Sequence, residues 1–193
     1  MKNSGTVRME TKRLVLRPFV IEDAGAMFRN WANDPQVTKF LSWEPHKDAE
    51  ETRRILEGWI QSYASGDYYN WAIEWKEDQG NVIGNISVPE LNQKAGRVTV
   101  GYCLGRKWWG NGIMKEAFAE LIRFFFEVEG ANRVEALHDI RNVNSGKVMA
   151  ACGLKKEGTL RRYGWNNQGI CDECIYGMVA SDYFEGKQRW ENK

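Results

Sequence analysis

Residues 101–117 read GYCLGRKWWGNGIMKEA, and no other stretch says as much about the fold. An apolar strand pattern over residues 97–104 runs directly into a loop that carries Gly110 and Gly112. A helical pattern then extends over about residues 113–129. Glycines at such a junction let backbone N–H groups converge on one point, and the helix N-terminus adds partial positive charge there. The segment therefore predicts an anion site suited to a phosphate or pyrophosphate.

This loop departs from the two common phosphate-binding signatures. No G-K-[ST] follows at P-loop spacing, and Lys115 stands where the third glycine of G-x-G-x-x-G belongs. Two cations, Arg106 and Lys107, lie beside the glycines and suit an anion. Without other support, the segment is equally compatible with a plain strand–turn–helix corner.

Hydrophobic periodicity along the chain gives the element order β-α-α-β-β-β-α-β-α-β-β. Strands are predicted over residues 11–18, 68–75, 81–89, 97–104, 133–138, 155–160 and 170–179, and helices over 22–31, 48–64, 113–129 and 145–151. Such an order predicts an α/β (α+β) fold with a mixed sheet covered by helices. A chain of 193 residues with 42% apolar residues suits one packed domain.

Composition excludes several classes of protein. Lys plus Arg number 27 and Asp plus Glu 26, so the net charge of +1 gives no field for nucleic acid. We expect no membrane partner and a cytoplasmic protein, because no apolar run approaches 18 residues and the N-terminus has no secretory h-region. Only Cys171 and Cys174 form a C-x-x-C pair, and no second pair of ligands has matching spacing, so no metal site is expected.

The run from Lys107 resembles the acyl-CoA-binding motif [QR]-x-x-G-x-[GA] of the Gcn5-related N-acetyltransferase (GNAT) family. Gly110 and Gly112 match its glycines, and Lys107 keeps the charge of the first position without the planar fork of arginine. The longer run WWGNG, followed by Glu116 and Ala117, is similar to Y-W-G-x-G-x-x-x-E-A. That form is typical of the branch with the ribosomal-protein N-terminal acetyltransferases (RimJ/RimL-like).

Two further segments carry the same resemblance. Residues 142–154, NVNSGKVMAACGL, resemble N-x-x-S-x-x-V/L-x-x-x-x-G-F/L, and Asn142 or Asn144 is expected to cap the helix there. The N-terminal TKRLVLR is similar to T-x-R-L-x-L-R. The resemblance covers residues 10–180 and leaves 1–9 and 181–193 as terminal extensions. It implies a single-domain GNAT fold, with a mixed, mostly antiparallel sheet of about seven strands, helices on its flanks and a splayed central pair.

The resemblance implies acetyl-CoA (coenzyme A) as the cofactor. Backbone amides of residues 100–104 would bind the pantetheine arm and the thioester oxygen, and the loop of residues 107–112 would hold the pyrophosphate. The residues expected at the cofactor are Tyr102, Cys103, Leu104, Lys107, Trp108, Trp109, Gly110, Asn111, Gly112, Ile113, Met114, Asn142 and Lys147.

Catalysis requires an acid for the leaving thiolate and a base for the amine. Ser145 occupies the motif position that supplies the acid in part of the branch, although it also reads as an ordinary helix N-terminal residue. Related enzymes can use a glutamate shortly after the sixth strand, but residues 161–165 carry no carboxylate. Glu90, acting through water, is the predicted substitute and Asp139 another, and both also read as ordinary surface acids.

The missing base bears on the acceptor. An α-amine with a pKa of about 7.7–8.0 is neutral in roughly one molecule in seven at pH 7, against roughly one in two thousand for a lysine amine. We therefore expect an N-acetyltransferase that acts on a protein or peptide N-terminus. The aromatic residues 40–43, with Tyr163 and Trp165, either line an acceptor pocket or belong to the core.

Two other functions stay open at this point. One is acetylation of a small-molecule amine such as a polyamine, an amino acid or an aminoglycoside. The other is a catalytically weak acyl-CoA-binding sensor. The family often forms dimers, which leaves a homodimer open.

Overall fold

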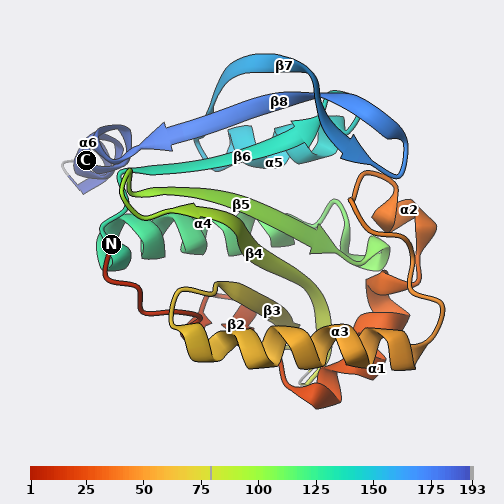
Figure 1. Cartoon of the computed structure of the whole chain (residues 1–193). Coiled ribbons are helices and arrows are strands. Elements are labelled where there is room, and N and C mark those ends of the chain that lie inside the picture. The colour runs from red at the N-terminus through yellow and green to blue at the C-terminus, as the bar shows by residue number, and fades with distance from the viewer. Residues whose placement is uncertain (79, 192–193) are drawn as a thin grey trace.

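The computed structural model describes residues 1–78 and 80–191, and the strands among them form one mixed sheet. The sheet has eight strands in the order β1-β2-β3-β4-β5-β6-β8-β7 (Figure 1). They are β1 (Met9–Glu10), β2 (Leu14–Arg17), β3 (Asn70–Trp75), β4 (Val82–Asn92), β5 (Arg97–Leu104), β6 (Arg133–Asp139), β7 (Lys155–Asn166) and β8 (Gly169–Val179). Neighbouring strands are antiparallel except for the parallel pair β5 and β6.

Helical segments cover both faces of this sheet (Figure 1). They are η1 (Ile21–Asp23), α1 (Ala24–Met27), η2 (Phe28–Ala32), α2 (Pro35–Thr38), α3 (Ala49–Ser62), η3 (Tyr63–Ser65), η4 (Arg106–Trp108), α4 (Ile113–Arg123), η5 (Phe124–Glu129), α5 (Val143–Ala151) and α6 (Ala180–Glu191). We call the side covered by α4 and α5 the α4 face, and the side covered by α1 and α3 the α3 face. The mixed sheet and flanking helices confirm the predicted fold class.

The predicted elements are present, with differences that have local causes. The two-residue β1 raises the predicted seven strands to eight, and such a short strand leaves no period in the sequence. Helix α2 was not predicted: Asp34 accepts a hydrogen bond from Gln36 N (2.9 Å) and caps a short helix that begins at Pro35. Helix α6 was not predicted.

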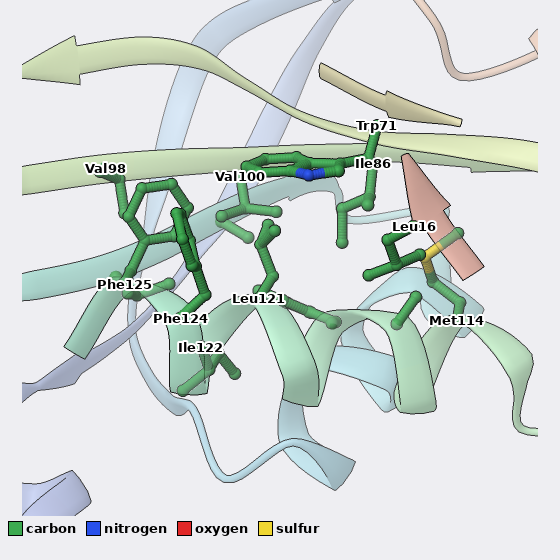
Figure 2. Close-up of a cluster of buried hydrophobic side chains, with 14 of the residues drawn as sticks. Leu16, Trp71, Ile86, Val98, Val100, Met114, Leu121, Ile122, Phe124 and Phe125 are labelled. Atoms are coloured by element: carbon green, nitrogen blue, oxygen red, sulfur yellow. The ribbon is translucent and has the colours of Figure 1, made fainter. Parts of the chain in front are cut away.

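The main hydrophobic core lies between helix α4 and the α4 face of the sheet. Figure 2 shows Met114 and Leu121 directed from the helix toward Trp71 and Val100 on the strands. All four side chains are buried, and burial of each large apolar side chain contributes about 1.5–3 kcal/mol. Burial of the apolar face of α4 against the sheet therefore holds the helix in place, and with it the loop that precedes the helix.

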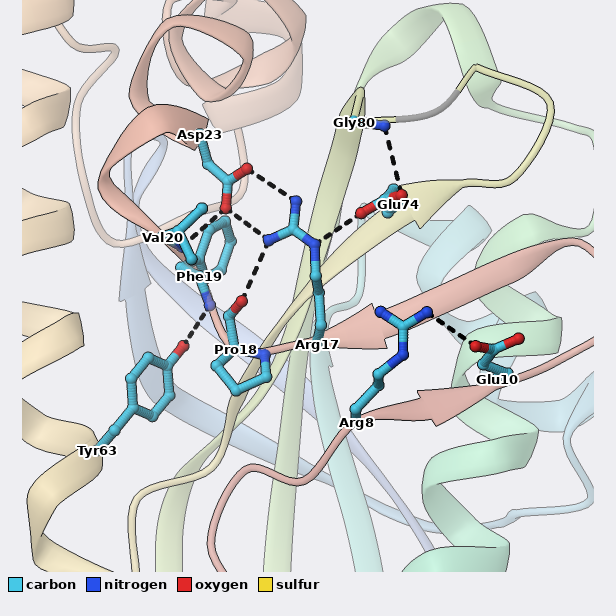
Figure 3. Close-up of polar contacts among 10 residues, drawn as sticks. All are labelled: Arg8, Glu10, Arg17, Pro18, Phe19, Val20, Asp23, Tyr63, Glu74 and Gly80. Carbon is cyan, nitrogen blue, oxygen red and sulfur yellow. Dashed lines mark hydrogen bonds and ion pairs between the residues drawn. The ribbon is translucent and has the colours of Figure 1, made fainter.

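An ion-paired arginine ties the edge of the sheet to the helices on the α3 face. Arg17 on β2 donates to both carboxylate oxygens of Asp23 (2.8 and 2.9 Å) and to Glu74 on β3 (2.6 Å), as Figure 3 shows. Nearby, the Tyr63 hydroxyl accepts from Phe19 N (3.0 Å) and donates to a strand carbonyl. These contacts set where the chain leaves β2 and enters α1.

The parallel strands β5 and β6 separate halfway along their length. Their ladder covers only residues 97–99 of β5 and 133–135 of β6, and it ends at the pair Thr99 and Glu135. The antiparallel ladder between β6 and β8 continues to the pair Asp139 and Glu173. A gap therefore opens between the second halves of β5 and β6, which confirms the predicted splay.

Candidate active site

The loop between β5 and α4 has the backbone geometry of an anion site. Gly110 (φ 77°) and Gly112 (φ 70°) adopt left-handed conformations, which glycine tolerates without steric cost. Within the described residues, no acceptor lies in hydrogen-bond range of the backbone N–H groups of residues 110–115. Unpaired amides at a helix N-terminus, in an exposed loop, suit a pyrophosphate. The loop therefore fits the phosphate end of acetyl-CoA.

The carbonyl groups of the loop are held by other side chains. Arg13 on the strand edge donates through Nη1 to Asn111 O (3.0 Å), and Trp109 Nε1 donates to Leu104 O (2.7 Å). Glu116 in turn accepts from Arg13 Nε (2.6 Å) and from the Thr11 hydroxyl (2.6 Å). In the sequence, Thr11 and Arg13 belong to one motif and Glu116 to another, and the structure joins the two motifs into one anchor.

Burial by itself would raise the pKa of Glu116, but hydrogen bonds from Thr11 and Arg13 outweigh it and hold that pKa below its ordinary value. The carboxylate is therefore charged at neutral pH and keeps the anchor in place. A loop held by a charged pair is pre-organised for its ligand.

The two cations beside the loop have different surroundings. Arg106 is ion-paired with Asp34 (3.0 Å), which occupies its guanidinium. Lys107 is exposed, and its ammonium lies 5.2 Å from the ring centre of Trp108. Trp109 is 45% exposed and offers an indole face beside the loop. Of these two cations, Lys107 is the one that has no ion-pair partner among the described residues, so it can meet a phosphate.

Two predicted residues meet across the gap between β5 and β6. Tyr102 on β5 projects to the α4 face, where its ring packs against Phe118. Its hydroxyl lies 2.9 Å from Ser145 Oγ and donates to Ser145 O (3.1 Å), on helix α5. Burial raises the pKa of Tyr102, so this hydroxyl stays protonated at neutral pH. The sequence predicts Tyr102 at the cofactor through the backbone amides of residues 100–104, and it does not predict this side-chain contact.

The remaining predicted cofactor residues divide into core and surface. Cys103, Leu104, Ile113 and Met114 are buried, so only their backbone groups can face a ligand in the gap or loop. Lys147 is exposed on α5. Asn111 is exposed in the loop, and its side chain donates to Trp109 O (3.2 Å).

Asn142 precedes α5 in the N-cap position, but its side chain makes no capping hydrogen bond. The helix begins at Val143, so Asn144 lies inside it and the capping prediction is wrong. At this end of the helix the hydrogen bond comes from the Asn142 backbone instead, because its carbonyl accepts from Ser145 N (3.1 Å). Its amide side chain is therefore free for a ligand.

Both predicted candidates for the base already have cationic partners. Glu90 follows the β4 irregularity, is exposed and forms an ion pair with Arg97. Asp139 is buried and accepts from Arg141 Nη2 (2.5 Å) and Asn166 Nδ2 (2.8 Å). The hydrogen bonds from Arg141, followed by that from Asn166, outweigh burial and hold the pKa of Asp139 well below its usual range.

The tip of the β7–β8 hairpin closes onto the segment after α2. Asn167 N donates to Leu41 O (3.1 Å), and the Asn167 side chain donates to Trp43 O (2.8 Å) and Thr38 O (3.0 Å). Figure 1 shows the hairpin end beside the α2 segment. The structure thus brings together the two regions whose aromatic residues were expected around an acceptor. On the hairpin, Tyr163 and Trp165 are 63% and 58% exposed.

Comparisons with known proteins agree with this geometry. Residues 13–155 match the model of the acetyltransferase (GNAT) domain. The N-acetyltransferase p20 of Bacillus licheniformis is 32% identical over 173 residues, which cover 90% of this chain and 96% of that protein. The ribosomal protein uS5-alanine N-acetyltransferase of Escherichia coli K12 is 25% identical, with 96% and 97% covered.

Solved structures share the fold. An acetyltransferase structure from T. thermophilus has a TM-score of 0.80 and 31% identity, covering 96% of this chain and 95% of that one. The microcin C7 self-immunity acetyltransferase MccE, solved with acetyl-CoA and AMP, has a TM-score of 0.78 at 20% identity, with 88% and 93% covered. No helix in the described part of this chain combines the length and apolarity that a membrane crossing needs.

Proposed function

The chain belongs to the family of GNAT acetyltransferases, and from that premise we propose that it acetylates the α-amine of a protein or peptide N-terminus. It is an acetyl-CoA-dependent N-acetyltransferase, and the proposal concerns the acceptor and the residues. We assign residues 10–180 to the catalytic domain. The observation that carries the residue assignment is the contact of Tyr102 with Ser145 at the gap between β5 and β6.

In this proposal, the loop amides of residues 110–115 bind the pyrophosphate, and Lys107 supplies a full charge beside them. The pantetheine arm enters the gap, where the β5 backbone beyond Thr99 has no β6 partner. Unpaired strand groups at such an edge can hydrogen-bond an extended amide ligand. Asn142, which precedes α5, and Lys147, which lies on α5, are at the other side of that arm.

Ser145 acts on the leaving group. As the amine nitrogen attacks the thioester carbon, the C–S bond breaks and negative charge develops on sulfur. A hydroxyl donor aimed at that sulfur stabilises the charge and can pass it a proton. The Tyr102 hydroxyl, 2.9 Å from Ser145 Oγ, orients the serine and remains protonated itself.

Three points support an α-amine acceptor. An α-amine is already neutral in roughly one molecule in seven at pH 7, so it needs far less help from a base than a lysine. A full-length relative of Escherichia coli acts on the alanine of ribosomal protein uS5. Exposed aromatic side chains at the hairpin, Tyr163 and Trp165, supply apolar contact for the residues that follow an N-terminus.

The test is an acetyl-CoA consumption assay across acceptors. The panel contains peptides with a free N-terminus, the same peptides blocked at the N-terminus but carrying a lysine, polyamines and aminoglycosides. We expect acceptor-dependent release of CoA with the free N-terminal peptides. Faster turnover of the lysine peptides or of a small amine would contradict the proposed acceptor, and acetyl-CoA binding without turnover on any amine would indicate a sensor.

A further inference from the structure

One carboxylate, that of Glu173, lies on the α3 face of β8, the strand next to β6. Cys103 belongs to the α3-face core, and Thr99 shares its face because side chains alternate along a strand. The pairs Thr99–Glu135 and Asp139–Glu173 carry that face across β6 to β8. Glu173 therefore lies at the same end of the sheet as the cofactor loop, and β6 separates it from the gap.

The α5 helix lies on the other side of the sheet at this point. Its Gly146 is so close to the His138 ring that a Cβ there would overlap it. His138 thus faces α5, and the next residue, Asp139, faces away from it together with its partner Glu173. Ser145 and Glu173 consequently lie on opposite faces of the sheet, at the end of the sheet where the gap opens.

Charged partners distinguish Glu173 from the other acids on this face. Glu90 and Glu135 are ion-paired with Arg97, and Asp139 is ion-paired with Arg141. Within the described residues, Glu173 has no hydrogen-bond or ion-pair partner, although it is half-buried. A half-buried carboxylate without a partner is destabilising, and such departures from local rules are expected at functional sites.

A glycine makes room for this carboxylate. Gly164 on β7 lies where the ladder with β8 shifts register, and a Cβ at Gly164 would overlap the Glu173 carboxylate. Gly164 belongs to the stretch of residues 161–165 in which a catalytic carboxylate was expected and is missing. The Glu173 side chain fills that space from the opposite strand of the hairpin.

We propose that Glu173 is the general base of this enzyme and that it accepts a proton from the acceptor ammonium, directly or through one water. The inference rests on the proposed function, because it deepens the account of the same site. It replaces Glu90, which is exposed and ion-paired with Arg97, as the residue that prepares the amine.

The protons and bonds balance in this scheme. The ammonium gives one proton to Glu173, and the neutral nitrogen then forms a C–N bond to the thioester carbon. The C–S bond breaks, and sulfur takes the Ser145 hydroxyl proton. The second proton lost by the nitrogen returns to Ser145 as the amide forms, and Glu173 releases its proton to solvent. The products are the acetylated amine, CoA thiol and one proton.

The surroundings of Glu173 favour proton uptake. Burial and then the charge of Asp139 raise the pKa of Glu173 above its ordinary value. Asp139 on β6 is ionised and ion-paired with Arg141, Cys171 is a titratable neighbour on β8, and β7 presents Leu160 and Gly164, which do not titrate. A carboxylate with a raised pKa is better matched to a base acting near neutral pH.

The test compares Glu173→Gln with Asp172→Asn, a matched charge change one residue away on the other face of β8. With a free N-terminal peptide at pH 7, we expect kcat/KM of Glu173→Gln to fall about sevenfold, the factor set by the neutral fraction of an α-amine, while the Kd for acetyl-CoA stays unchanged. The loss should shrink below about twofold at pH 9.5, because an α-amine is neutral there without a base. Asp172→Asn should stay within twofold of the wild type at both pH values.

Several outcomes overturn the inference. Activity of Glu173→Gln within twofold of the wild type at pH 7 would do so, as would a loss of equal size at every pH, which indicates a structural role. A pH-dependent loss in Glu90→Gln but not in Glu173→Gln would return the base to Glu90. Failure of the proposed function is seen separately, in a wild-type protein that acetylates no N-terminal peptide.

Discussion

The hydroxyl of Tyr102 lies 2.9 Å from Ser145 Oγ, although 43 positions separate the two residues in the chain. One comes from the half of β5 that has left β6, and the other from the first turn of α5. Their contact therefore spans the opening into which the cofactor arm is proposed to enter. Two of the residues expected from separate motifs thus form one polar unit.

Removal of the Ser145 hydroxyl should impair turnover without impairing cofactor binding. We expect Ser145→Ala to lower kcat about 100-fold, because the departing thiolate loses its proton donor. The Kd for acetyl-CoA, measured by calorimetry, should change less than twofold. Equal losses in kcat and in acetyl-CoA affinity would instead mark Ser145 as a binding residue.

Tyr102→Phe should have a smaller effect than Ser145→Ala. The phenylalanine keeps the ring contact with Phe118 and removes only the hydroxyl. One lost hydrogen bond is worth about 1 kcal/mol, which corresponds to about a fivefold fall in kcat. The double variant should be no slower than Ser145→Ala, since the tyrosine acts through the serine. Additive losses in steady-state assays would argue against this dependence.

One left-handed glycine of the loop can be compared with a matched left-handed glycine outside it. Gly110 (φ 77°) and Gly130 (φ 72°) both have open space where a Cβ would be, and they lie before and after the helix that begins at Ile113. Alanine at either position should lower the free energy of unfolding by about 1 kcal/mol, through backbone strain. Only Gly110→Ala should also weaken acetyl-CoA binding, by about tenfold, because relief of the strain turns the amides away. Equal affinities in the two variants would contradict the anion site.

Glu116→Gln should destabilise the protein in a pH-dependent way. The pKa of Glu116 lies below its ordinary value of 4.5, so its contribution is present above pH 4.5 and is lost as the pH falls below it. We expect a loss of about 2 kcal/mol at pH 7 in urea unfolding, for a charged group with several hydrogen bonds. The difference from the wild type should narrow below pH 4.5. A constant difference would assign the loss to packing.

Glu173→Gln should show the opposite behaviour in stability. A raised carboxyl pKa means that ionisation of Glu173 disfavours the native state. The contribution of Glu173 to the free energy of unfolding is therefore highest below pH 4.5 and declines as the pH rises through the raised pKa. The glutamine avoids this decline. We expect a Tm at or above that of the wild type at pH 7 and no difference near pH 4. A lower Tm at pH 7 would show that the carboxylate supports the fold.

The sequence by itself determined the order of the longer strands and helices and the glycine loop before Ile113, and its family resemblance implied the splayed sheet. Local periodicity, turn residues and contiguous motifs carry that information, because each depends on residues close together in the chain. The strand over residues 97–104 was predicted with its observed ends. Short elements such as β1 and α2 span too few residues to show a period.

Only the tertiary structure decided which side chains have partners. Glu90 looked available in the sequence, but Arg97 pairs with it from the next strand. No sequence motif marks Glu173. Within the described part of the chain, its carboxylate has no hydrogen-bond or ion-pair partner, and it lies where Gly164 has no side chain. Pairing across strands depends on register and on bulges, which bring distant residues together and which no local pattern encodes.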